Sequence, residues 1–337
     1  MDKILLGHGS GGRLMHQLIR EYIAPQFDMH ALADSAVLDG AAFNGGRIAF
    51  TTDSYVVSPL FFPGGNIGEL AINGTVNDLA MVGARPLYLS TGFVIEEGFP
   101  LESLRRILIS MADASKKAKV KIVAGDTKVV DKGKGDGIFI TSSGIGAIPE
   151  GVIMGPDMIR PGDKVIISGT IGNHGVAVLS ERNGLSFDPP VLSDTAALNE
   201  LVDLMLKCAG DIRMMRDPTR GGVATTLKEM ATESGLPVII NEEQLPVPNG
   251  VKGACELLGL DPLYIANEGI LLAIVPSEKA EALVAGMREH PLGRGTSLIG
   301  EIGPDDPKKK GMVLLKTAIG GTRIVDMLAG EQLPRIC

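Results

Sequence analysis

Apolar residues recur at two spacings in the first half of this chain, and each spacing predicts one kind of element. Short apolar runs at residues 48–53 and 121–124 predict strands, the first of which delivers Asp53 at its tip. The stretch at 67–82 is predicted to be helical, and leucine and methionine at helical spacing predict a second helix over 101–112. Strands and helices therefore alternate in this half.

The same alternation continues in the second half. Ser193 is a good N-cap residue and predicts the start of a helix. The pattern predicts an α/β or α+β protein made of two similarly built modules, residues 1–155 and 156–320, with a tail at residues 321–337. The predicted strands of the second half are 164–168, 237–240, 269–275 and 297–301, and the predicted helices are 176–182, 193–207, one that ends near 235, and 277–290.

Composition narrows the class of protein. Hydrophobic residues make up 45% of the 337 residues and Trp is absent, so an aliphatic core is expected. A net charge of −8, with no basic run beyond Lys308-Lys309-Lys310, argues against nucleic-acid binding. No apolar run reaches membrane-spanning length, and the N-terminus lacks the pattern of a signal peptide. Three widely spaced cysteines argue against a disulfide framework, so we expect a cytoplasmic protein.

The three cysteines are expected to differ in role. Cys208 and Cys255 lie in apolar helical patterns and are expected to be inert core residues. Cys337 ends a segment that starts at Gly321, after the last predicted strand, and such a segment could reach about 50 Å when extended. One interpretation is a frayed tail with a chance cysteine. The other is a thiol that carries a chemical group, which requires machinery in the body of the protein.

A glycine-rich turn near the N-terminus is the first candidate for such machinery. His8, Gly9, Ser10, Gly11 and Gly12 precede a helical pattern, and a turn of this kind can offer N–H groups to phosphate. Similar turns are common in proteins without a ligand, so this signal by itself is weak.

Acidic residues near the ends of apolar runs are the second candidate. Asp34, Asp53, Asp78 and Asp126 lie at predicted strand ends or loop borders. Any one of them can be explained as a helix cap or a turn residue. As a set they are hard oxygen ligands, and no His/Cys cluster at zinc spacing accompanies them. The metal they indicate is Mg²⁺ carrying phosphates.

The order of several motifs along the chain resembles a known superfamily. The segments 7–12, 51–55, 74–78, 125–128, 216–222 and 267–269 are similar to the ATP-using superfamily of aminoimidazole ribonucleotide synthetase, the PurM-like proteins. The segment 60–68 and the terminal Pro-Arg-Ile-Cys narrow the resemblance to the carbamoyl dehydratases of hydrogenase maturation. The resemblance spans essentially the whole chain.

This resemblance implies a reaction and a set of partners. A carbamoyltransferase, HypF, places a carbamoyl group on the terminal cysteine, and ATP then drives its dehydration to a thiocyanate. The cyanide passes to iron on the HypC–HypD complex, for the active site of [NiFe] hydrogenase. The resemblance also implies a homodimer in which the N-terminal sheets of two subunits form a shared β-barrel, with the nucleotide near that interface.

Position by position, the resemblance also implies roles for residues. The carboxylates that hold Mg²⁺ and the phosphates of ATP are then Asp34, Asp53, Asp78, Asp126 and Asp217.

Other positions would complete the site. The turn 8–12 would cover the phosphates or the tail, and Thr127 would join the nucleotide site. Lys128 is either a charge partner of the transferred group or part of a structural ion pair. Glu268 is the candidate general base, with a plain surface carboxylate as the alternative. Cys337 would be the sulfur that accepts the carbamoyl group.

Two other kinds of function stay open from the residues. One is another enzyme of the superfamily, such as a purine-pathway synthetase, thiamine phosphate kinase or selenophosphate synthetase; the last uses a reactive cysteine or selenocysteine near its N-terminus, whereas the first cysteine here is Cys208. The other is a carrier or scaffold whose tail shuttles a group while the body only docks partners. The acidic loops argue against a pure carrier.

Overall fold

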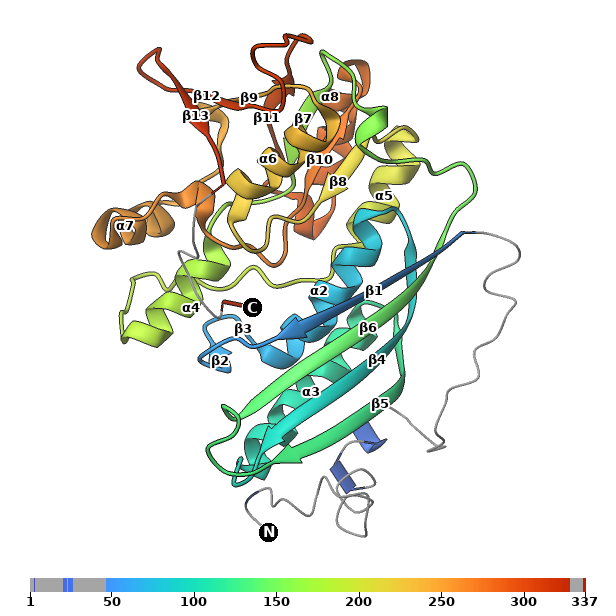
Figure 1. Ribbon diagram of the computed structural model, residues 1–337, viewed down its shortest axis with the longest axis vertical. Coiled ribbons are helices and arrows are strands. Elements are labelled where there is room, and N and C mark those ends of the chain that lie inside the picture. Colours follow the sequence, from blue (N-terminus) through green and yellow to red (C-terminus); the bar gives the residue numbers. More distant parts are fainter. Residues whose placement is uncertain (1–2, 4–20, 23, 27–46, 328–335) are drawn as a thin grey trace.

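The computed structural model describes residues 3, 21–22, 24–26, 47–327 and 336–337 of the chain. These residues form two sheet-based halves that meet along a long central helix, α2 (Figure 1). The described C-terminal residues lie between the halves, close to α4 and the β2–β3 hairpin (Figure 1). No helix among the described residues is both long and apolar enough to cross a membrane.

The first half is a sheet covered on one face by two helices. In the described residues its strand order is β1-β6-β4-β5, with β4 and β5 parallel and the other pairs antiparallel. The parallel pair follows from the helical crossover between β4 and β5. Its elements are β1 (Arg47–Tyr55), β2 (Phe61–Phe62), β3 (Gly65–Asn66), α2 (Ile67–Met81), β4 (Arg85–Glu96), α3 (Leu101–Lys117), β5 (Lys121–Val130) and β6 (Ile138–Ile148).

Two strands of this sheet are longer than their apolar runs predicted. Asp53 lies two residues before the end of β1 and pairs with Ser142, so it is not at the tip of the strand. Asp126 lies in the middle of β5 and pairs with Gly92 of β4. The ladder extends both strands because pairing with neighbours, and not hydrophobicity, holds their polar ends.

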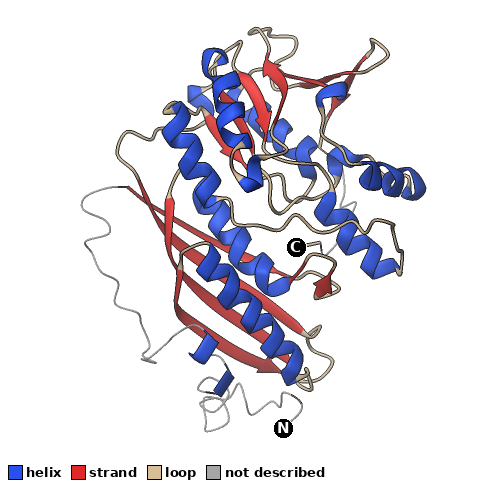
Figure 2. Cartoon of the chain, turned by 180° about the vertical axis from the view of Figure 1, so that it is seen from behind, coloured by secondary structure: helices blue, strands red, loops and turns tan. Residues whose placement is uncertain are grey.

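Helix α2 is buried on nearly all sides. The side chain of Asn66 caps its N-terminus by accepting the N–H groups of Gly68 and Glu69. Both α2 and α3 cross the same face of the first sheet (Figure 2), and α2 also contacts α5 and β8 of the second half. A helix packed from both sides positions its polar residues between the two halves.

The second half is a larger sheet with helices on both faces. Its order in the described residues is β13-β12-β9-β11-β7-β10-β8. Helix α6 packs in the core on one face, and α5 and α8 pack in a separate core on the other. Its elements are β7 (Lys164–Ile167), α4 (Asn173–Asn183), α5 (Asn199–Ala209), β8 (Met214–Arg216), α6 (Gly222–Ser234), β9 (Val238–Asn241), α7 (Asn249–Leu258), β10 (Leu272–Val275), α8 (Ser277–Arg288), β11 (Ser297–Ile302), β12 (Val313–Lys316) and β13 (Thr322–Val325).

Two local predictions for this half are wrong. Ser193 does not cap a helix: α5 begins at Asn199, and the Ser193 hydroxyl bonds to His174 instead. The segment after Gly321 is not wholly without structure, because residues 322–325 form β13 on the edge of the sheet. In both cases a specific partner decided the local structure: His174 binds the Ser193 hydroxyl, and the neighbouring strand β12 pairs with β13.

Candidate active site

Four acidic side chains from both halves form an electrostatically coupled cluster, here called the acidic cluster. Asp53 comes from β1 and Asp78 from α2, while Asp217 and Glu268 come from the loops after β8 and before β10. Alternation along β1 turns Asp53 toward α2, and Asp78 accepts a hydrogen bond of 2.8 Å from the Thr51 hydroxyl. The fold thus brings together four residues that the sequence analysis selected.

Burial and mutual repulsion raise the pKa values of three members of this cluster, Asp78, Asp217 and Glu268. Burial, followed by the charge of Asp53, raises the pKa of Asp78 above its usual range. Burial and the charges of Asp78 and Asp53 raise the pKa of Asp217 to about 7. Burial and the charge of Asp217 raise the pKa of Glu268 well above its ordinary value. Carboxylates held this close favour a bound cation or a proton.

Glu268 is not the surface carboxylate that the sequence left as the alternative. Its exposed fraction is only 3%, and its Oε1 atom has no hydrogen-bond partner among the described residues. A buried carboxyl with a raised pKa and an unused oxygen can exchange a proton with a substrate. These properties agree with a role as general base.

Asp194, which was not among the predicted site residues, positions Glu268. Its carboxylate accepts the backbone N–H groups of Glu268 and Gly269 over 3.1–3.3 Å, and also that of His174. Gly269 must lack a side chain, because a Cβ there would lie 1.7 Å from the Asp194 carbonyl oxygen. Burial raises the pKa of Asp194 to about 6. Nothing in the sequence indicated this role, because Asp194 lies in a loop without a motif and its partners are 74 and 75 positions away.

Asn77, next to Asp78 on α2, ties the same loops to the first half. Its amide nitrogen donates to the carbonyl oxygens of Ala196 (3.0 Å) and Glu268 (3.4 Å), and its oxygen accepts the N–H of Leu198 (2.8 Å). The Asn-Asp pair on α2 therefore supplies one acidic group and one anchor for the loop that carries the candidate base.

Tyr55 is a second residue that the sequence did not select. It is buried at the end of β1, 3.4 Å from the Thr75 hydroxyl, and a Cβ on Gly74 would lie 2.3 Å from its hydroxyl. Burial and the charge of Asp53 raise the pKa of Tyr55 well above its ordinary value, so its hydroxyl keeps its proton. Its ring belongs to the hydrophobic core of the first half.

Three selected residues on β5 are not brought into the acidic cluster. Thr127 is buried on the helix-covered side, whereas Asp126 and Lys128 are exposed on the opposite face. Lys128 pairs with Asp126 over 2.9–3.0 Å, and this contact lowers the pKa of Asp126. Within one subunit these two residues form the ion pair that was the alternative for Lys128.

Six of the residues that were predicted to form the site lie outside the described part of the chain. They are His8, Gly9, Ser10, Gly11, Gly12 and Asp34.

The last two residues of the chain dock beside the acidic cluster. The Val56 N–H donates to the carbonyl oxygen of Cys337 (3.0 Å), and Val56 directly follows Tyr55. Ile336 is 3% exposed within the core of the first half, and its carbonyl oxygen lies 2.7 Å from Nε2 of His174. The backbone of the terminal residue is therefore held next to the strand that carries Asp53.

The other two cysteines lie elsewhere. Cys255 is buried on α7, as expected. Cys208 is exposed, contrary to the expectation, because the apolar stripe of α5 formed by Val202, Met205 and Ala209 faces the core on another side of the helix. Neither of the two belongs to the core around Cys337.

The donor set of the acidic cluster fits Mg²⁺ bridged to phosphate. In the described part of the chain, three His, Cys, Asp or Glu side chains do not converge into a finished metal cage. Mg²⁺ needs no such cage, because it is usually held by one or two carboxylates together with phosphates and water. Asp53, Asp78 and Asp217 supply hard oxygen atoms of the right kind, and the excess negative charge favours a cation.

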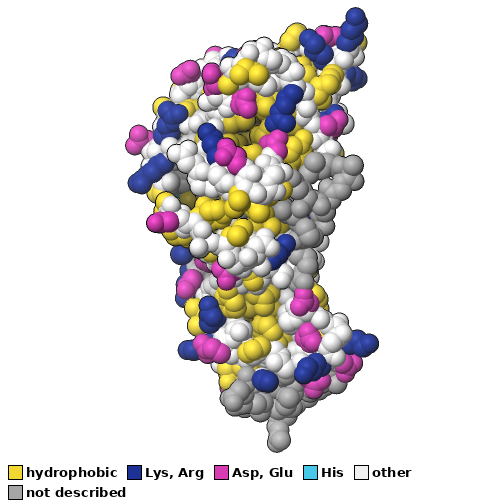
Figure 3. Space-filling model, turned by 90° about the vertical axis from the view of Figure 1, so that its left-hand side faces the viewer, with side chains coloured by type: hydrophobic (Ala, Val, Ile, Leu, Met, Phe, Trp, Pro, Cys, Tyr) yellow, Lys and Arg dark blue, Asp and Glu magenta, His cyan; other side chains and the backbone are white. Residues whose placement is uncertain are grey.

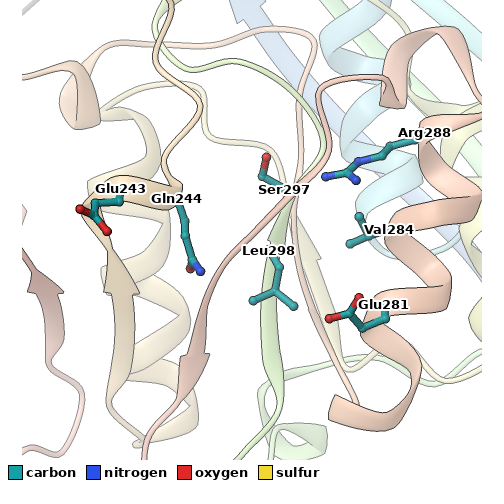
Figure 4. A pocket seen from close by; sticks show the side chains of 7 residues that line it. All are labelled: Glu243, Gln244, Glu281, Val284, Arg288, Ser297 and Leu298. Carbon is teal, nitrogen blue, oxygen red and sulfur yellow. The ribbon is translucent and has the colours of Figure 1, made fainter. Parts of the chain in front are cut away.

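Two clefts lie away from the predicted site residues. One, of about 410 Å³, lies between α8 and the segment at Glu243 and Gln244, with Glu281, Arg288 and Leu298 in its wall (Figure 4). The other, of about 730 Å³, is lined by residues 187–192 and by the start of α7. Hydrophobic side chains gather near the middle of the face that bears α4 and α7 (Figure 3). None of the selected site residues lines either cleft.

The two halves match two known domain families. The family described as AIR synthase related protein, N-terminal domain, matches residues 33–148, and its C-terminal domain family matches residues 160–310. The fold therefore defines the class of protein: an AIR synthase related protein with two domains and an acidic cluster between them.

Known relatives narrow this class. Carbamoyl dehydratase HypE of Cupriavidus necator is 53% identical over 338 residues, which cover 99% of this chain and 95% of that protein. The crystal structure of hydrogenase maturation protein HypE in complex with ATP has a TM-score of 0.94 and 48% identity, covering 99% of this chain and 100% of that one. A HypE–HypF complex has a TM-score of 0.80 and 47% identity, covering 94% and 100%. The chain belongs to the HypE family of carbamoyl dehydratases, within the AIR synthase related proteins, which confirms the predicted family and α/β fold.

Proposed function

We propose that this protein is an ATP-dependent carbamoyl dehydratase of [NiFe] hydrogenase maturation and that it acts on its own C-terminal cysteine. The observation that carries this proposal is the docking of Ile336 and Cys337 beside the acidic cluster. A relative with 48% identity binds ATP, which supports ATP as the cosubstrate. The rival superfamily enzymes would leave the docked thiol without a purpose, and a pure carrier would leave the acidic cluster without one.

The chemistry explains why ATP is needed. The amide oxygen of the S-carboxamide is a poor leaving group, and transfer of the γ-phosphoryl group to it turns it into phosphate. When the C–O bond breaks, phosphate leaves with that oxygen. The nitrogen loses both protons over the two steps, and its electrons form the C≡N bond. The products are the thiocyanate, ADP, phosphate and one net proton.

The residues of the site divide this work. Glu268 takes a proton from nitrogen, and Asp194 and Asn77 hold its backbone in place. Asp53, Asp78 and Asp217 would hold Mg²⁺, which would neutralise the negative charge of the phosphates. The buried setting keeps water from the reacting group. Intact-mass analysis of the carbamoylated protein before and after addition of ATP tests the reaction, with loss of one water as the expected result.

Asp78→Asn is expected to weaken Mg-ATP binding while leaving the fold intact. Asparagine can still accept the hydrogen bond from Thr51 but lacks the charge that holds the metal–phosphate unit. Loss of even an outer partner of a metal costs roughly 10- to 100-fold in affinity, so at least about tenfold weaker binding is expected. Calorimetry measures this, with Asp113→Asn on the exposed side of α3 as the matched control. Equal affinity in Asp78→Asn and wild type would remove Asp78 from the nucleotide site.

The proposed reaction requires two partner proteins, one that donates the carbamoyl group to the Cys337 thiol and one that accepts the cyanide. HypF is proposed as the carbamoyl donor, since a relative forms a HypE–HypF complex, and the HypC–HypD complex is proposed as the cyanide acceptor. The Cys337 thiol would visit HypF, the acidic cluster and the acceptor in turn. A cysteine in a rigid loop could hardly serve all three.

The open face of the first sheet is proposed to form a homodimer. Phe50 and Ile48 of β1 are 68% and 54% exposed, and Val94 of β4 is also exposed. Such an apolar sheet face is expected to be covered by a partner, and a second copy would close a shared barrel. Asp126 and Lys128 lie on this face too. In the dimer they would therefore contact a nucleotide only if the nucleotide bound near the interface.

Phe50→Asp is therefore expected to give monomers. Burial of a phenylalanine contributes about 2 kcal/mol, and a two-fold interface loses two of them, so dimerisation should weaken by at least about a hundredfold. Light scattering at micromolar concentration measures the mass, with Leu257→Asp on exposed α7 as the control. A wild-type protein that is monomeric and fully active would contradict the dimer.

A further inference from the structure

We propose that His174 is a positioning residue for the C-terminal tail: its Nε2–H holds the carbonyl oxygen of Ile336 and so sets how far Cys337 reaches toward the acidic cluster. This inference rests on the proposed function for its purpose. The contact itself is independent of that function, because both partners lie in the described structure, 2.7 Å apart.

The hydrogen-bond chemistry leaves one arrangement for the imidazole. A carbonyl oxygen only accepts, so the proton of the neutral ring must be on Nε2. Nδ1 must then accept, and the Ser193 hydroxyl lies 2.8 Å away to donate to it. Ser193 itself accepts the N–H of Thr195 over 3.2 Å, which directs its own proton to the ring. Ser193 thus selects the tautomer that can bind the tail.

The ring is held rigidly in this position. His174 is fully buried at the start of α4, and the edge-to-face contact with Phe62 has a centroid distance of 5.3 Å. Burial lowers the pKa of His174 to about 4, so the ring stays neutral at physiological pH. A neutral donor fits a carbonyl oxygen that must be released in each cycle.

One carboxylate connects the holder of the tail to the candidate base. Asp194 accepts the backbone N–H of His174 at the start of α4 and those of Glu268 and Gly269. The N–H of Gly175 also donates to the carbonyl oxygen of Ala266 (3.0 Å), in the same loop as Glu268. The distance between the bound tail and the base is therefore fixed by short protein contacts.

The tail is held by its backbone and by one apolar side chain. His174 and Val56 bind the carbonyl oxygens of the last two residues, and the Ile336 side chain enters the core of the first half. Together these contacts leave the Cys337 side chain as the part of the tail that can present a reactive group. His174 would thus fix the register of the tail without touching the reacting atoms.

Two substitutions at His174 separate its two hydrogen bonds. The amide of His174→Gln can reach the place of Nε2 and keep the bond to Ile336, whereas the shorter amide of His174→Asn can replace only Nδ1 and keep the bond to Ser193. The rate of Cys337 alkylation by iodoacetamide, followed by peptide mass analysis, reports how firmly the tail is docked. Exposed Cys208 in the same molecule serves as the internal reference.

We expect His174→Asn to speed Cys337 alkylation about tenfold relative to Cys208, and His174→Gln to stay within about threefold of wild type, because the hydrogen bond to the Ile336 carbonyl oxygen is lost only in the first. Equal rates in wild type and both variants would overturn the proposal, as would equal acceleration in both. Ile336→Ala tests the same docking from the tail. Faster alkylation in this variant supports docking, and an unchanged rate overturns it.

The single-turnover rate of dehydration links docking to function. In carbamoylated protein, His174→Asn should lower this rate about tenfold with unchanged Mg-ATP affinity, and His174→Gln should restore most of it. Faster alkylation with an unaltered dehydration rate would overturn the positioning role. If wild type also fails to dehydrate, the proposed function fails, while the alkylation rates still decide whether His174 holds the tail.

Discussion

Cys337→Ala is expected to abolish both the carbamoyl adduct and its ATP-dependent loss of water. The substitution removes the thiol of the cysteine that docks at the end of β1, and the other two cysteines lie elsewhere in the described structure. The fold and Mg-ATP binding should stay as in wild type, because the Cys337 backbone oxygen still accepts the N–H of Val56. Intact-mass analysis after incubation with the carbamoyl donor, and again after ATP, measures both events.

Cys208→Ala provides the matched control. Cys208 is the more exposed of the other two thiols, so any nonspecific carbamoylation would occur there first. This variant should acquire and dehydrate the adduct like wild type. A Cys337→Ala protein that still gains and dehydrates the adduct would move the acceptor to Cys208 or Cys255 and would contradict the proposed function.

Glu268→Gln is expected to lower the rate of dehydration by about 10²- to 10⁴-fold, the usual contribution of a general base. Glutamine keeps the size and the buried position but cannot take a proton. The adduct on Cys337 should form normally, because HypF and not this site supplies it. Single-turnover mass analysis measures the rate, with Glu256→Gln on the exposed side of α7 as the control. A rate equal to wild type would leave Glu268 with a structural role only.

The pH dependence adds a second readout for Glu268. Burial and Asp217 raise its pKa well above the ordinary value, so the ionised form gains population only as the pH rises. A general base must be ionised to act. The dehydration rate of wild type should therefore be low at acid pH and rise as the pH passes through this raised pKa. The residual rate of Glu268→Gln should not show this decrease at acid pH, which is the acid limb of the profile. An acid limb that persists unchanged in the variant would assign it to another group.

The sequence by itself determined the elements with strong local periodicity and the types of reactive residue. The helices at α2, α3 and α8 and the strands at β7, β9 and β11 lie where the apolar spacing predicted them. The terminal thiol and the carboxylates Asp53 and Asp78 stood out because hard oxygen atoms and a thiol are themselves the chemical signal, whereas Asp217 was implied by the family resemblance. Local spacing suffices for these features because each one depends only on neighbours in the chain.

The tertiary structure alone decided which of these residues can act together. Asp126 looked equivalent to Asp53, yet strand alternation turns it and Lys128 to the opposite face of the same sheet. Glu268 has a raised pKa because it is buried and lies near Asp217, which is distant in the sequence. Asp194 and His174 belong to no motif that marked them in the sequence. Their roles come from contacts such as the one between His174 and Ile336, 162 positions apart in sequence. Burial, pKa and hydrogen-bond partners are set by whatever the fold packs alongside, and local periodicity does not encode that.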